Sequence, residues 1–340
     1  MTKIGFFGVK PWEKEYLENK LGSVKELQAT FSENIISSEH LPEETDLEII
    51  SVFVDCLISR ELLGRLPKLK FVTTRSTGFD HIDHKACAER GITVSSVPSY
   101  GENTVAEFAF GLILSLSRKI AASWDQVRET GSFNLDSLQG FDLKGKTLGV
   151  IGTGKIGCRI IKMANGFEMN VVAYDPYPRE DLAKTLNFSY LSLEEVLKSS
   201  DIVTLHVPYM KETHHLLNDK TIAFMKRGAY VVNTSRGGII DTEVLVRALK
   251  SGQVGGAGLD VLEEEGVIKD ELDFLSNGRP EDHNLKTIIA NHVLIDLPNV
   301  IVTPHNAFNS REALQRILDT TIENINGFLG NKPVNLVKPR

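Results

Sequence analysis

The chain has 340 residues, 41% of them hydrophobic and 24% charged, close to the averages of soluble globular proteins, so a disordered chain is excluded. At about 150 residues per domain, this length favours two domains. The 38 Lys and Arg residues against 45 Asp and Glu residues leave a net charge of −7, which argues against nucleic acid or an anionic membrane as a partner. Three widely spaced cysteines and no signal-peptide pattern predict a reduced, cytoplasmic protein without a disulfide framework.

Apolar runs in the first hundred residues predict a first α/β unit. Four runs read as strands, at 3–9, 47–54, 69–75 and 92–97. The charged segments between the first three of these runs read as helices. This unit carries no glycine fingerprint for phosphate binding.

An apolar segment at 105–117 predicts a buried helix. A bilayer needs about 20 apolar residues, and Glu107 interrupts a run that is already shorter, so we expect no membrane span. Thr104 and Glu107 form a capping box, which predicts that the helix begins at Thr104. Because most of its faces are apolar, we expect this helix to be buried where two domains meet.

From Lys146 onward, short apolar runs alternate with amphipathic segments. Strands are predicted at 147–151, 170–175, 201–206, 229–234, 256–260 and 299–303. Helices are predicted at 155–164, 192–199, 242–251 and 310–329. A capping box at Ser192 and Glu195 supports the second of these helices. Strands and helices that alternate at this spacing predict right-handed βαβ units and a parallel sheet.

A glycine fingerprint lies between the predicted strand at 147–151 and the helix after it. The motif is Gly152-Thr153-Gly154-Lys155-Ile156-Gly157. Gly152 permits a tight turn, Gly154 lets backbone amides approach a pyrophosphate, and Gly157 lets the helix pack closely on the strand. The helix N-terminus then faces the phosphates with its partial positive charge. The strand–turn–helix context therefore predicts a dinucleotide site.

Asp175 ends the next predicted strand, at the distance expected for a carboxylate that binds the adenosine ribose hydroxyls. A carboxylate there would repel a 2′-phosphate. The following residues, 176–178, supply no cation, and Arg179 lies four positions away. The sequence therefore predicts NAD rather than NADP as the cofactor.

Three charged residues lie just after later strands. Arg236 follows the strand at 229–234, Glu265 follows the strand at 256–260, and His305 follows the strand at 299–303. Ligands bind at the carboxyl ends of strands in open α/β sheets. These residues therefore suggest an anion clamp, Arg236, and an acid–base pair, His305 with Glu265.

With these residues together, the chain resembles the D-isomer-specific 2-hydroxyacid dehydrogenases over nearly its whole length. The matching pieces are VIGTGKIG, NTSRGG, GLDVLEEE and NVIVTPH, in family order and spacing. The resemblance implies that Arg236, Glu265 and His305 are the catalytic residues. Because Glu265 ends a run of three glutamates, a shift of the match to Glu264 stays open.

A closer likeness is to the D-lactate dehydrogenase branch of this family. TRSTGFDHID, at 74–83, resembles its substrate-carboxylate loop, and VPSYGENTVAE, at 97–107, resembles its PAYSPxxxAE segment. The resemblance implies substrate contacts from Thr77, Gly78, Phe79 and Tyr100, together with Arg236. A long segment at 266–298 is a further feature of the branch. Residues 306–309 differ from lactate-specific members, so the exact substrate stays open.

The resemblance also implies further cofactor contacts and a fold. The expected cofactor contacts beyond the fingerprint and Asp175 are His206, Val207, Pro208, Thr234, Ser235, Arg236, Asp260 and His305. The expected fold is α/β, with two doubly wound parallel-sheet domains: a Rossmann NAD-binding domain at 101–302, inserted into a flavodoxin-like substrate domain at 1–100 plus 303–340. The active site would lie in the cleft between the domains, and the protein would be a homodimer.

The sequence therefore predicts an NAD-dependent D-2-hydroxyacid dehydrogenase, with D-lactate dehydrogenase favoured. Its partner would be a small 2-oxo or 2-hydroxy acid. Alternatives are a dehydrogenase for a bulkier acid, of the D-2-hydroxyisocaproate or phenyllactate type, and a non-enzymatic NAD-sensing co-regulator. The segment 80–84 and the pair His214-His215 could suggest a metal, but neither has the pattern of a structural zinc site, so no metal is expected.

Overall fold

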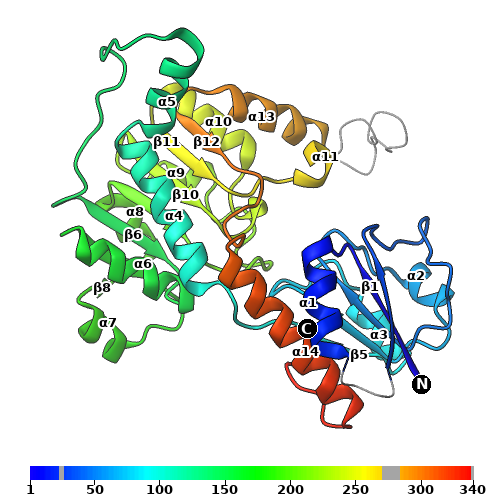
Figure 1. The fold of residues 1–340 in the computed structure, drawn as a ribbon. Helices are drawn as coiled ribbons and strands as arrows, with labels where there is room; N and C mark the ends of the chain where they lie inside the picture. The colour runs from blue at the N-terminus through cyan, green and yellow to red at the C-terminus, as the bar shows by residue number, and fades with distance from the viewer. Residues whose placement is uncertain (23–26, 270–283, 338–340) are drawn as a thin grey trace. The chain divides into compact units, whose positions relative to one another are not determined.

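The computed structural model describes residues 1–22, 27–269 and 284–337 (Figure 1). The chain divides into two compact units. We name residues 1–101 with 309–340 the discontinuous unit, and residues 102–308 the inserted unit. The second boundary lies six residues beyond the expected position 303, because the turn that carries His305 is bonded to Asp260 of the inserted unit.

A seven-stranded, fully parallel sheet forms the centre of the inserted unit. Its order is β12-β11-β10-β9-β6-β7-β8, so the direction of winding reverses between β6 and β9. This is the Rossmann strand order with one further strand. The strands are β6 (Thr147–Ile151), β7 (Asn170–Tyr174), β8 (Ser189–Tyr190), β9 (Ile202–Leu205), β10 (Ala229–Asn233), β11 (Val254–Leu259) and β12 (Val300–Val302).

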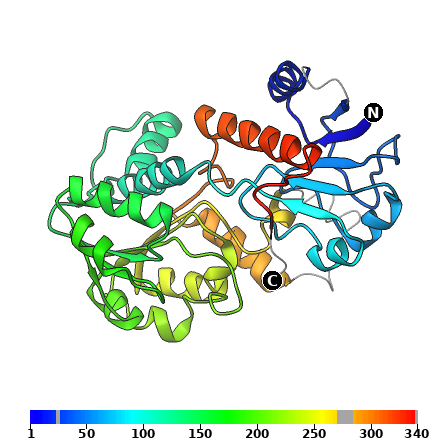
Figure 2. The same cartoon turned by 90° about the horizontal axis from the view of Figure 1, so that it is seen from below.

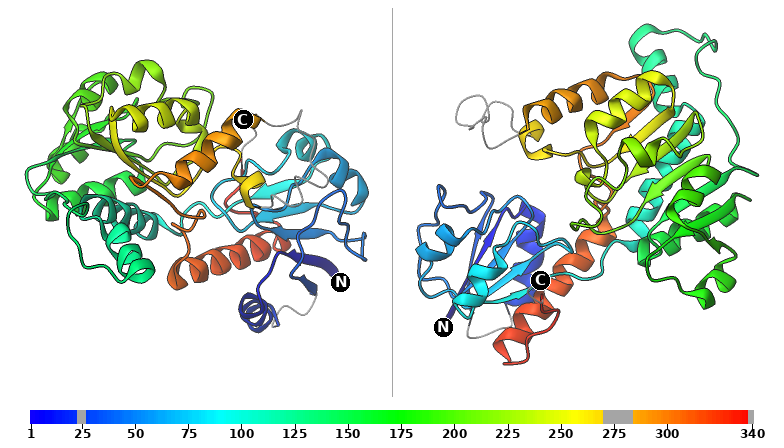
Figure 3. Two further views of the ribbon diagram at one scale, coloured as in Figure 1. Left: turned by 90° about the horizontal axis from the view of Figure 1, so that it is seen from above. Right: turned by 180° about the vertical axis from the view of Figure 1, so that it is seen from behind.

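Helices cover both faces of this sheet, each over its own apolar cluster. One face carries α4 (Glu102–Ser117) and α6 (Lys155–Gly166), which pack on each other and on the strands. The other face carries α10 and α13, of which α13 (Leu285–Asp296) is drawn in orange in Figure 3. The remaining helices of the unit are α5 (Ile120–Thr130), α7 (Glu180–Leu186), α8 (Leu193–Ser199), α9 (Asp219–Ile222), the 3-10 turn η1 (Gly237–Ile239), α10 (Thr242–Ser251), α11 (Glu265–Lys269) and α13 (Leu285–Asp296).

The discontinuous unit has a five-stranded parallel sheet in the order β2-β1-β3-β4-β5, which is the flavodoxin-like order. Helices α1 and α14 share one apolar cluster, and α2 and α3 belong to another. Figure 2 shows α14 (red) lying along the sheet although it comes from the other end of the chain. The elements are β1 (Thr2–Phe7), α1 (Pro11–Leu21), β2 (Leu27–Ser32), β3 (Ile49–Val52), α2 (Arg60–Arg65), β4 (Phe71–Thr74), α3 (His84–Glu89), β5 (Thr93–Ser95) and α14 (Arg311–Leu329).

The predicted fold class is confirmed, and several element boundaries match. β6 and α10 have the predicted bounds, and the Ser192 and Glu195 capping box begins α8. Two predictions are wrong. The segment between the first two predicted strands holds a strand, β2, after its helix, and α4 begins at Glu102 rather than at Thr104.

Two expectations concern features that the structure describes only in part. Within the described ranges, no helix is both long and apolar enough to cross a membrane, and no cluster of side chains could hold a metal ion. Of the long segment at 266–298, residues 270–283 lie outside the described residues. The described ends of this segment form α11 and α13.

Candidate active site

The glycine loop lies at the carboxyl end of β6, where the winding of the seven-stranded sheet reverses. Gly152 has φ +93°, and a Cβ there would lie 2.5 Å from the carbonyl oxygen of His206. A Cβ on Gly157 would lie 2.1 Å from the Gly152 carbonyl oxygen, so only glycine lets α6 pack this closely. By contrast, a Cβ on Gly154 would meet no atom of the described chain within 4 Å. The loop is therefore closely packed against the protein at Gly152 and Gly157 and open at Gly154.

The N-terminus of α6 is available to an anion. Its N-cap, Gly154, provides no side-chain hydrogen bond to the first turn. The amides of that turn, at Lys155 and Ile156, therefore keep their donor capacity and the positive end of the helix dipole. The ammonium of Lys155 lies 3.2 Å from the carboxylate of Glu102. This geometry fits a pyrophosphate, as the fingerprint predicts.

Asp175 is bonded to the glycine loop. Its Oδ2 accepts from the backbone N–H of Thr153 at 2.8 Å and from the Thr153 hydroxyl at 3.0 Å, and its Oδ1 accepts from the N–H of Tyr177 at 2.9 Å. Arg179 returns to the same loop, where its guanidinium donates to the Thr153 carbonyl and lies 3.8 Å from the Cys158 sulfur. Arg179, the nearest base in the sequence, therefore returns to the loop whose Thr153 is hydrogen-bonded to Asp175.

His206 follows β9, directly across the switch point from the glycine loop. Its Nε2 lies 2.9 Å from the Thr204 hydroxyl, while its Nδ1 is buried with no partner among the described residues. Burial lowers the pKa of His206 to about 3. The imidazole is therefore neutral at physiological pH and offers this edge a dipole rather than a charge. Val207 and Pro208 continue the chain from here.

The loop after β10 carries Thr234, Ser235 and Arg236. The Ser235 hydroxyl donates to the Leu205 carbonyl at 2.7 Å, and Arg236 donates to the Ser235 carbonyl at 2.7 Å. The Thr234 hydroxyl is buried with no partner in the described part of the chain. An orphaned hydroxyl at this edge costs free energy unless a ligand satisfies it. The loop therefore fits a polar ligand such as the cofactor.

His305 and Glu265 form the pair that the sequence suggests. Nδ1 of His305 lies 2.8 Å from Oε1 of Glu265, and the two side chains are 26% and 32% exposed. Of the three successive glutamates, Glu265 reaches His305, whereas Glu263 faces His215. A carboxylate that accepts from Nδ1 fixes the orientation of the ring.

Asp260 has a role that the sequence did not indicate, since the resemblance implied only a cofactor contact. It is 1% exposed, and its Oδ1 accepts from the Thr303 hydroxyl at 2.6 Å and from the Asn306 N–H at 2.8 Å. Its Oδ2 accepts from the Ala307 N–H at 2.8 Å. Burial raises the pKa of Asp260 against these bonds. Asp260 therefore holds the turn on which His305 lies, with a φ of +52° at His305.

In the discontinuous unit, the expected substrate loop follows β4. Hydroxyl bonds hold it: Thr77 Oγ1 donates to the Val97 carbonyl at 2.7 Å, and Ser76 Oγ donates to the Gly78 carbonyl at 2.6 Å. The backbone N–H groups of Thr77 and Gly78 donate to no acceptor among residues 1–22, 27–269 and 284–337. Two adjacent free amides are suited to a carboxylate. Phe79 packs edge-on against His84.

Arg75, at the same edge, was missed by the sequence analysis. Its guanidinium donates to the carbonyls of Phe7, Gly8 and Ser51 and to the Ser51 hydroxyl, at 2.7–3.1 Å. It is 2% exposed, and burial lowers its pKa from the ordinary value. Tyr100 lies near the end of the first part of this unit, 1–101, and its carbonyl accepts from Arg316 at 2.7 Å. The sequence offered one indication that Arg75 is buried: it is a single arginine at the end of the apolar strand predicted at 69–75.

Comparisons with known proteins agree with this geometry. Residues 110–307 match the model of the D-isomer specific 2-hydroxyacid dehydrogenase NAD binding domain. The chain is 39% identical to 2-hydroxyacid dehydrogenase homolog 1 of Schizosaccharomyces pombe, over 99% of both chains. It is 35% identical to D-lactate dehydrogenase of Escherichia coli, over 95% of both chains. The structure of D-lactate dehydrogenase from Aquifex aeolicus, complexed with NAD and lactic acid, superposes with a TM-score of 0.84 at 36% identity and covers 99% of this chain and 100% of that one.

The glycine loop, the open helix N-terminus and the orphaned Thr234 hydroxyl all fit NAD at one edge of the seven-stranded sheet. The relatives match the chain from end to end, so the likeness is not confined to a cofactor domain. The chain belongs to the D-isomer-specific 2-hydroxyacid dehydrogenase family, and it is an NAD-dependent oxidoreductase.

Proposed function

We propose that this protein is a D-lactate dehydrogenase, which reduces pyruvate to D-lactate with NADH. The observation that carries the proposal is the His305–Glu265 pair, at 2.8 Å, on the same sheet edge as the Arg236 loop and the glycine loop. The similar D-lactate dehydrogenases support pyruvate as the substrate. The inserted unit would then be the NAD-binding domain and the discontinuous unit the substrate-binding domain.

Arg236 is the proposed carboxylate-binding residue. A 2-oxo acid carries a carboxylate beside its carbonyl, and a guanidinium binds a carboxylate through two parallel hydrogen bonds. The amides of Thr77 and Gly78 are proposed to bind the same anion without adding charge. Binding through the carboxylate orients C2 for reaction, which is where most of the rate gain from proximity arises.

His305 is the proposed acid–base catalyst. NADH, when bound, supplies the hydride that C2 receives. As negative charge grows on the carbonyl oxygen, the imidazolium of His305 donates its Nε2 proton to that oxygen. Glu265, on the opposite ring nitrogen, holds the ring in orientation and stabilises the charged form before the transfer. In the reverse direction, neutral His305 accepts the hydroxyl proton of the 2-hydroxy acid.

Asp175 is the proposed determinant of the preference for NAD. Its carboxylate faces the loop that carries Thr153, and a 2′-phosphate there would meet a negative charge. Arg179 is bonded to the Thr153 carbonyl and so weakens this repulsion without removing it. We therefore propose a preference for NAD that is finite rather than absolute.

A dehydrogenase for a bulkier acid is the second candidate. Tyr100 favours a small pocket, whereas Asn309 stands where lactate-specific members carry other residues. A few methylenes of substrate are discriminated by only about 1–3 kcal/mol each. An NAD-sensing co-regulator is a third reading, against which the His305–Glu265 pair argues, because sensing requires no acid–base pair.

NADH consumption by the purified protein decides among these candidates. It is measured against pyruvate, 2-oxobutyrate, 2-oxoisocaproate and phenylpyruvate, with NADPH as the control. We expect the highest kcat/KM with pyruvate and NADH, and D-lactate as the product. A maximum on a bulky oxo acid would keep the mechanism and change the substrate. Intact NADH binding without turnover on any of the four acids would contradict the enzyme assignment.

We also propose that the protein is a homodimer, joined through the inserted unit, and that it is cytoplasmic. Helix α5 and the segment after it expose five large apolar side chains, at 42–83% of their surface: Ile120, Trp124, Val127, Phe133 and Leu135. Such a patch is unusual on a monomer and suits a second copy of the same surface. Sedimentation should give twice the chain mass, and Phe133→Asp should shift it toward the monomer.

A further inference from the structure

The two loops proposed to carry Arg236 and Glu265 are in direct backbone contact. A Cβ on Gly237 would lie 2.0 Å from the carbonyl carbon of Leu262 and 2.2 Å from the nitrogen of Glu263. Gly237, the residue after Arg236, thus packs on the peptide bond between Leu262 and Glu263, and Glu263 lies two residues before Glu265. Because their backbones are in contact, a displacement of one loop displaces the other.

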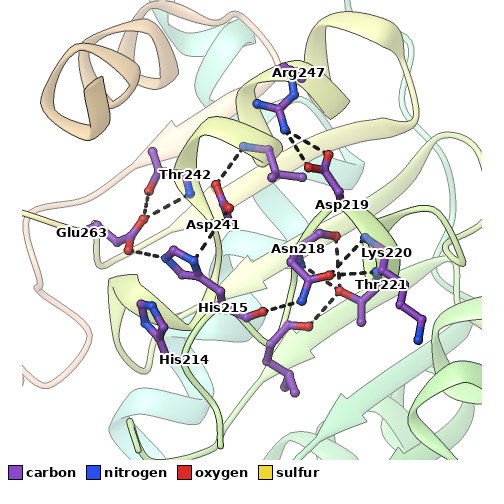
Figure 4. Close-up of polar contacts among 12 residues, drawn as sticks. His214, His215, Asn218, Asp219, Lys220, Thr221, Asp241, Thr242, Arg247 and Glu263 are labelled. Carbon is purple, nitrogen blue, oxygen red and sulfur yellow. Dashed lines mark hydrogen bonds and ion pairs between the residues drawn. The ribbon is translucent and has the colours of Figure 1, made fainter. Parts of the chain in front are cut away.

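His215 contacts both of these loops, and Figure 4 shows its side-chain contact with Glu263. Its backbone N–H donates to the carbonyl of Gly238 at 2.9 Å, in the Arg236 loop. Its side-chain Nε2 lies 2.7 Å from Oε1 of Glu263, two residues before Glu265. A single residue therefore holds one loop through its backbone and the other through its side chain.

Glu263 is hydrogen-bonded through both carboxylate oxygens and through its backbone carbonyl. Its Oε2 accepts from the Thr242 hydroxyl at 2.6 Å and from the Thr242 N–H at 3.1 Å, at the first turn of α10. Its carbonyl accepts from the side-chain amide of Asn291 at 2.6 Å. The Glu263 side chain is 15% exposed, so these bonds lie largely away from water. Losing a hydrogen-bond partner leaves such a group buried and unsatisfied, which is unfavourable.

The surroundings of His215 restrict its ring. Its Nδ1 lies 3.7 Å from Oδ2 of Asp241, and its ring stacks on that of His214 at 3.8 Å. His214 contacts Tyr209 but has no bond to Glu263 among the described residues. The backbone of His215 is left-handed, with φ +48°, as are Glu264 at +53° and His305 at +52°. Strained backbone of this kind persists where surrounding bonds enforce it, and it concentrates at functional sites.

We propose that His215 is a positioning residue for hydride transfer: through Glu263 it holds the loop that keeps Glu265 against His305, in register with the Arg236 loop. The inference rests on the proposed function, because it concerns the roles of those three residues. It differs from a metal-binding role for His214-His215, and from a role confined to stabilising the fold.

The test uses His215→Asn in the full-length protein, with His214→Asn as the matched control. Asparagine accepts the left-handed backbone but is too short to reach Glu263. We expect His215→Asn to lower kcat about tenfold, because misplacement of a catalytic group by a fraction of an ångström has effects of this size. The Kd for NADH should stay within about twofold of wild type, and His214→Asn should change kcat less than about twofold.

A double-mutant cycle separates positioning from general stability. In a Glu265→Ala background, His215→Asn should lower kcat by less than about twofold further, because the group through which it acts is gone. A full tenfold further loss would overturn the proposal, as would equal losses in His215→Asn and His214→Asn. If His215→Asn does not fold, Glu263→Gln replaces it, with an expected loss of about threefold that also disappears in the Glu265→Ala background.

An inactive wild-type protein would overturn the proposed function, and the inference is then decided by NMR. In protein labelled with ¹⁵N-histidine, the Nδ1 proton of His305 is identified by its loss in Glu265→Ala. A shift of this signal in His215→Asn, but not in His214→Asn, supports the proposal. An unchanged signal in both variants overturns it.

Discussion

Two buried charges organise the carboxyl edges of the two sheets, and they are opposite in sign. In the inserted unit, the carboxylate of Asp260 gathers two N–H groups and a hydroxyl from the turn that carries His305. In the discontinuous unit, the guanidinium of Arg75 gathers three carbonyls and a hydroxyl from the ends of β1 and β3. Each charge supplies hydrogen bonds to polar groups that are buried at its sheet edge.

The difference in sign follows from which backbone groups each edge presents to its buried charge. A tight turn after β12 presents N–H groups, so an anion holds it, whereas strand ends at β1 and β3 present carbonyls, so a cation holds them. The edge held by Asp260 carries side chains that titrate, and the edge held by Arg75 offers backbone amides. We infer that the first edge carries the proposed chemistry and the Arg236 guanidinium, and that the second edge offers amides suited to an anion. The experiments below test this division, beginning with the largest expected effect.

His305→Ala removes the proposed proton donor of the first edge. We expect kcat for pyruvate reduction to fall about 1,000-fold, within the range of general acid–base catalysis. The Kd for NADH, measured by fluorescence, should stay near the wild-type value because the glycine loop is untouched. Turnover close to wild type would remove His305 from the mechanism.

Arg75→Met removes the charge that organises the second edge. Four acceptors would lose their donor in a buried site, and we expect the free energy of unfolding to fall by about 3 kcal/mol. Urea unfolding measures this loss. The control is Arg65→Met, an exposed arginine on α2, for which a change below about 0.5 kcal/mol is expected. Equal losses in the two variants would contradict the role of Arg75.

Arg236→Ala tests whether anion recognition also depends on the first edge. The loss of a charge-assisted, two-point bond should raise KM for pyruvate about 100-fold and change kcat less. Initial rates at saturating NADH measure both constants. Should kcat fall while KM stays constant, Arg236 would act in the chemical step and not in binding.

Asp175→Ala tests the cofactor preference of the first edge. Loss of the carboxylate should narrow the ratio of kcat/KM for NADH over NADPH about tenfold, because the repulsion of a 2′-phosphate disappears while Arg179 remains. Arg179→Ala in the wild-type background should widen the same ratio. An unchanged ratio in both variants would exclude this pair as determinants of cofactor choice.

The smallest expected effect is that of pH on cofactor binding through His206. Because burial lowers the pKa of His206 to about 3, the ring stays neutral from pH 8 down to pH 6. Because its pKa is depressed, His206 becomes protonated only in the acid range, far below neutral pH. The Kd for NADH should therefore differ less than about twofold between pH 6 and pH 8, in wild type and in His206→Gln alike. A steep change present only in wild type would show that His206 titrates.

The patterns that succeeded in the sequence are local or periodic. The strand at Thr147–Ile151, the helix at Thr242–Ser251 and the cap of α8 by Ser192 are set by residues a few positions apart. β2 lies at the sheet edge and has no fully buried side chain, so its apolar side is weak. Its residues, LQATFS, do alternate between apolar and polar, and this strand signal was missed. α4 begins before its capping box, at Glu102.

For the candidate site, the sequence indicated the functional residues and their order along the chain, but not all of their hydrogen-bond partners. The glycine fingerprint, Arg236, Glu265 and His305 could be read from their places after strands, and the structure brings Glu265 within 2.8 Å of His305. The contacts of Arg75, Arg179 and His215 could not, because their partners lie 26 to 68 residues away in the chain.

The sequence by itself determined the alternating α/β architecture, the dinucleotide loop and the family, because these depend on short-range periodicity and on glycines that admit no side chain. Only the tertiary structure decided which buried charge holds each sheet edge, which glutamate meets His305, and that His215 joins two loops. Those contacts depend on how distant strand ends converge, and convergence is a property of the packed sheet rather than of any segment of it.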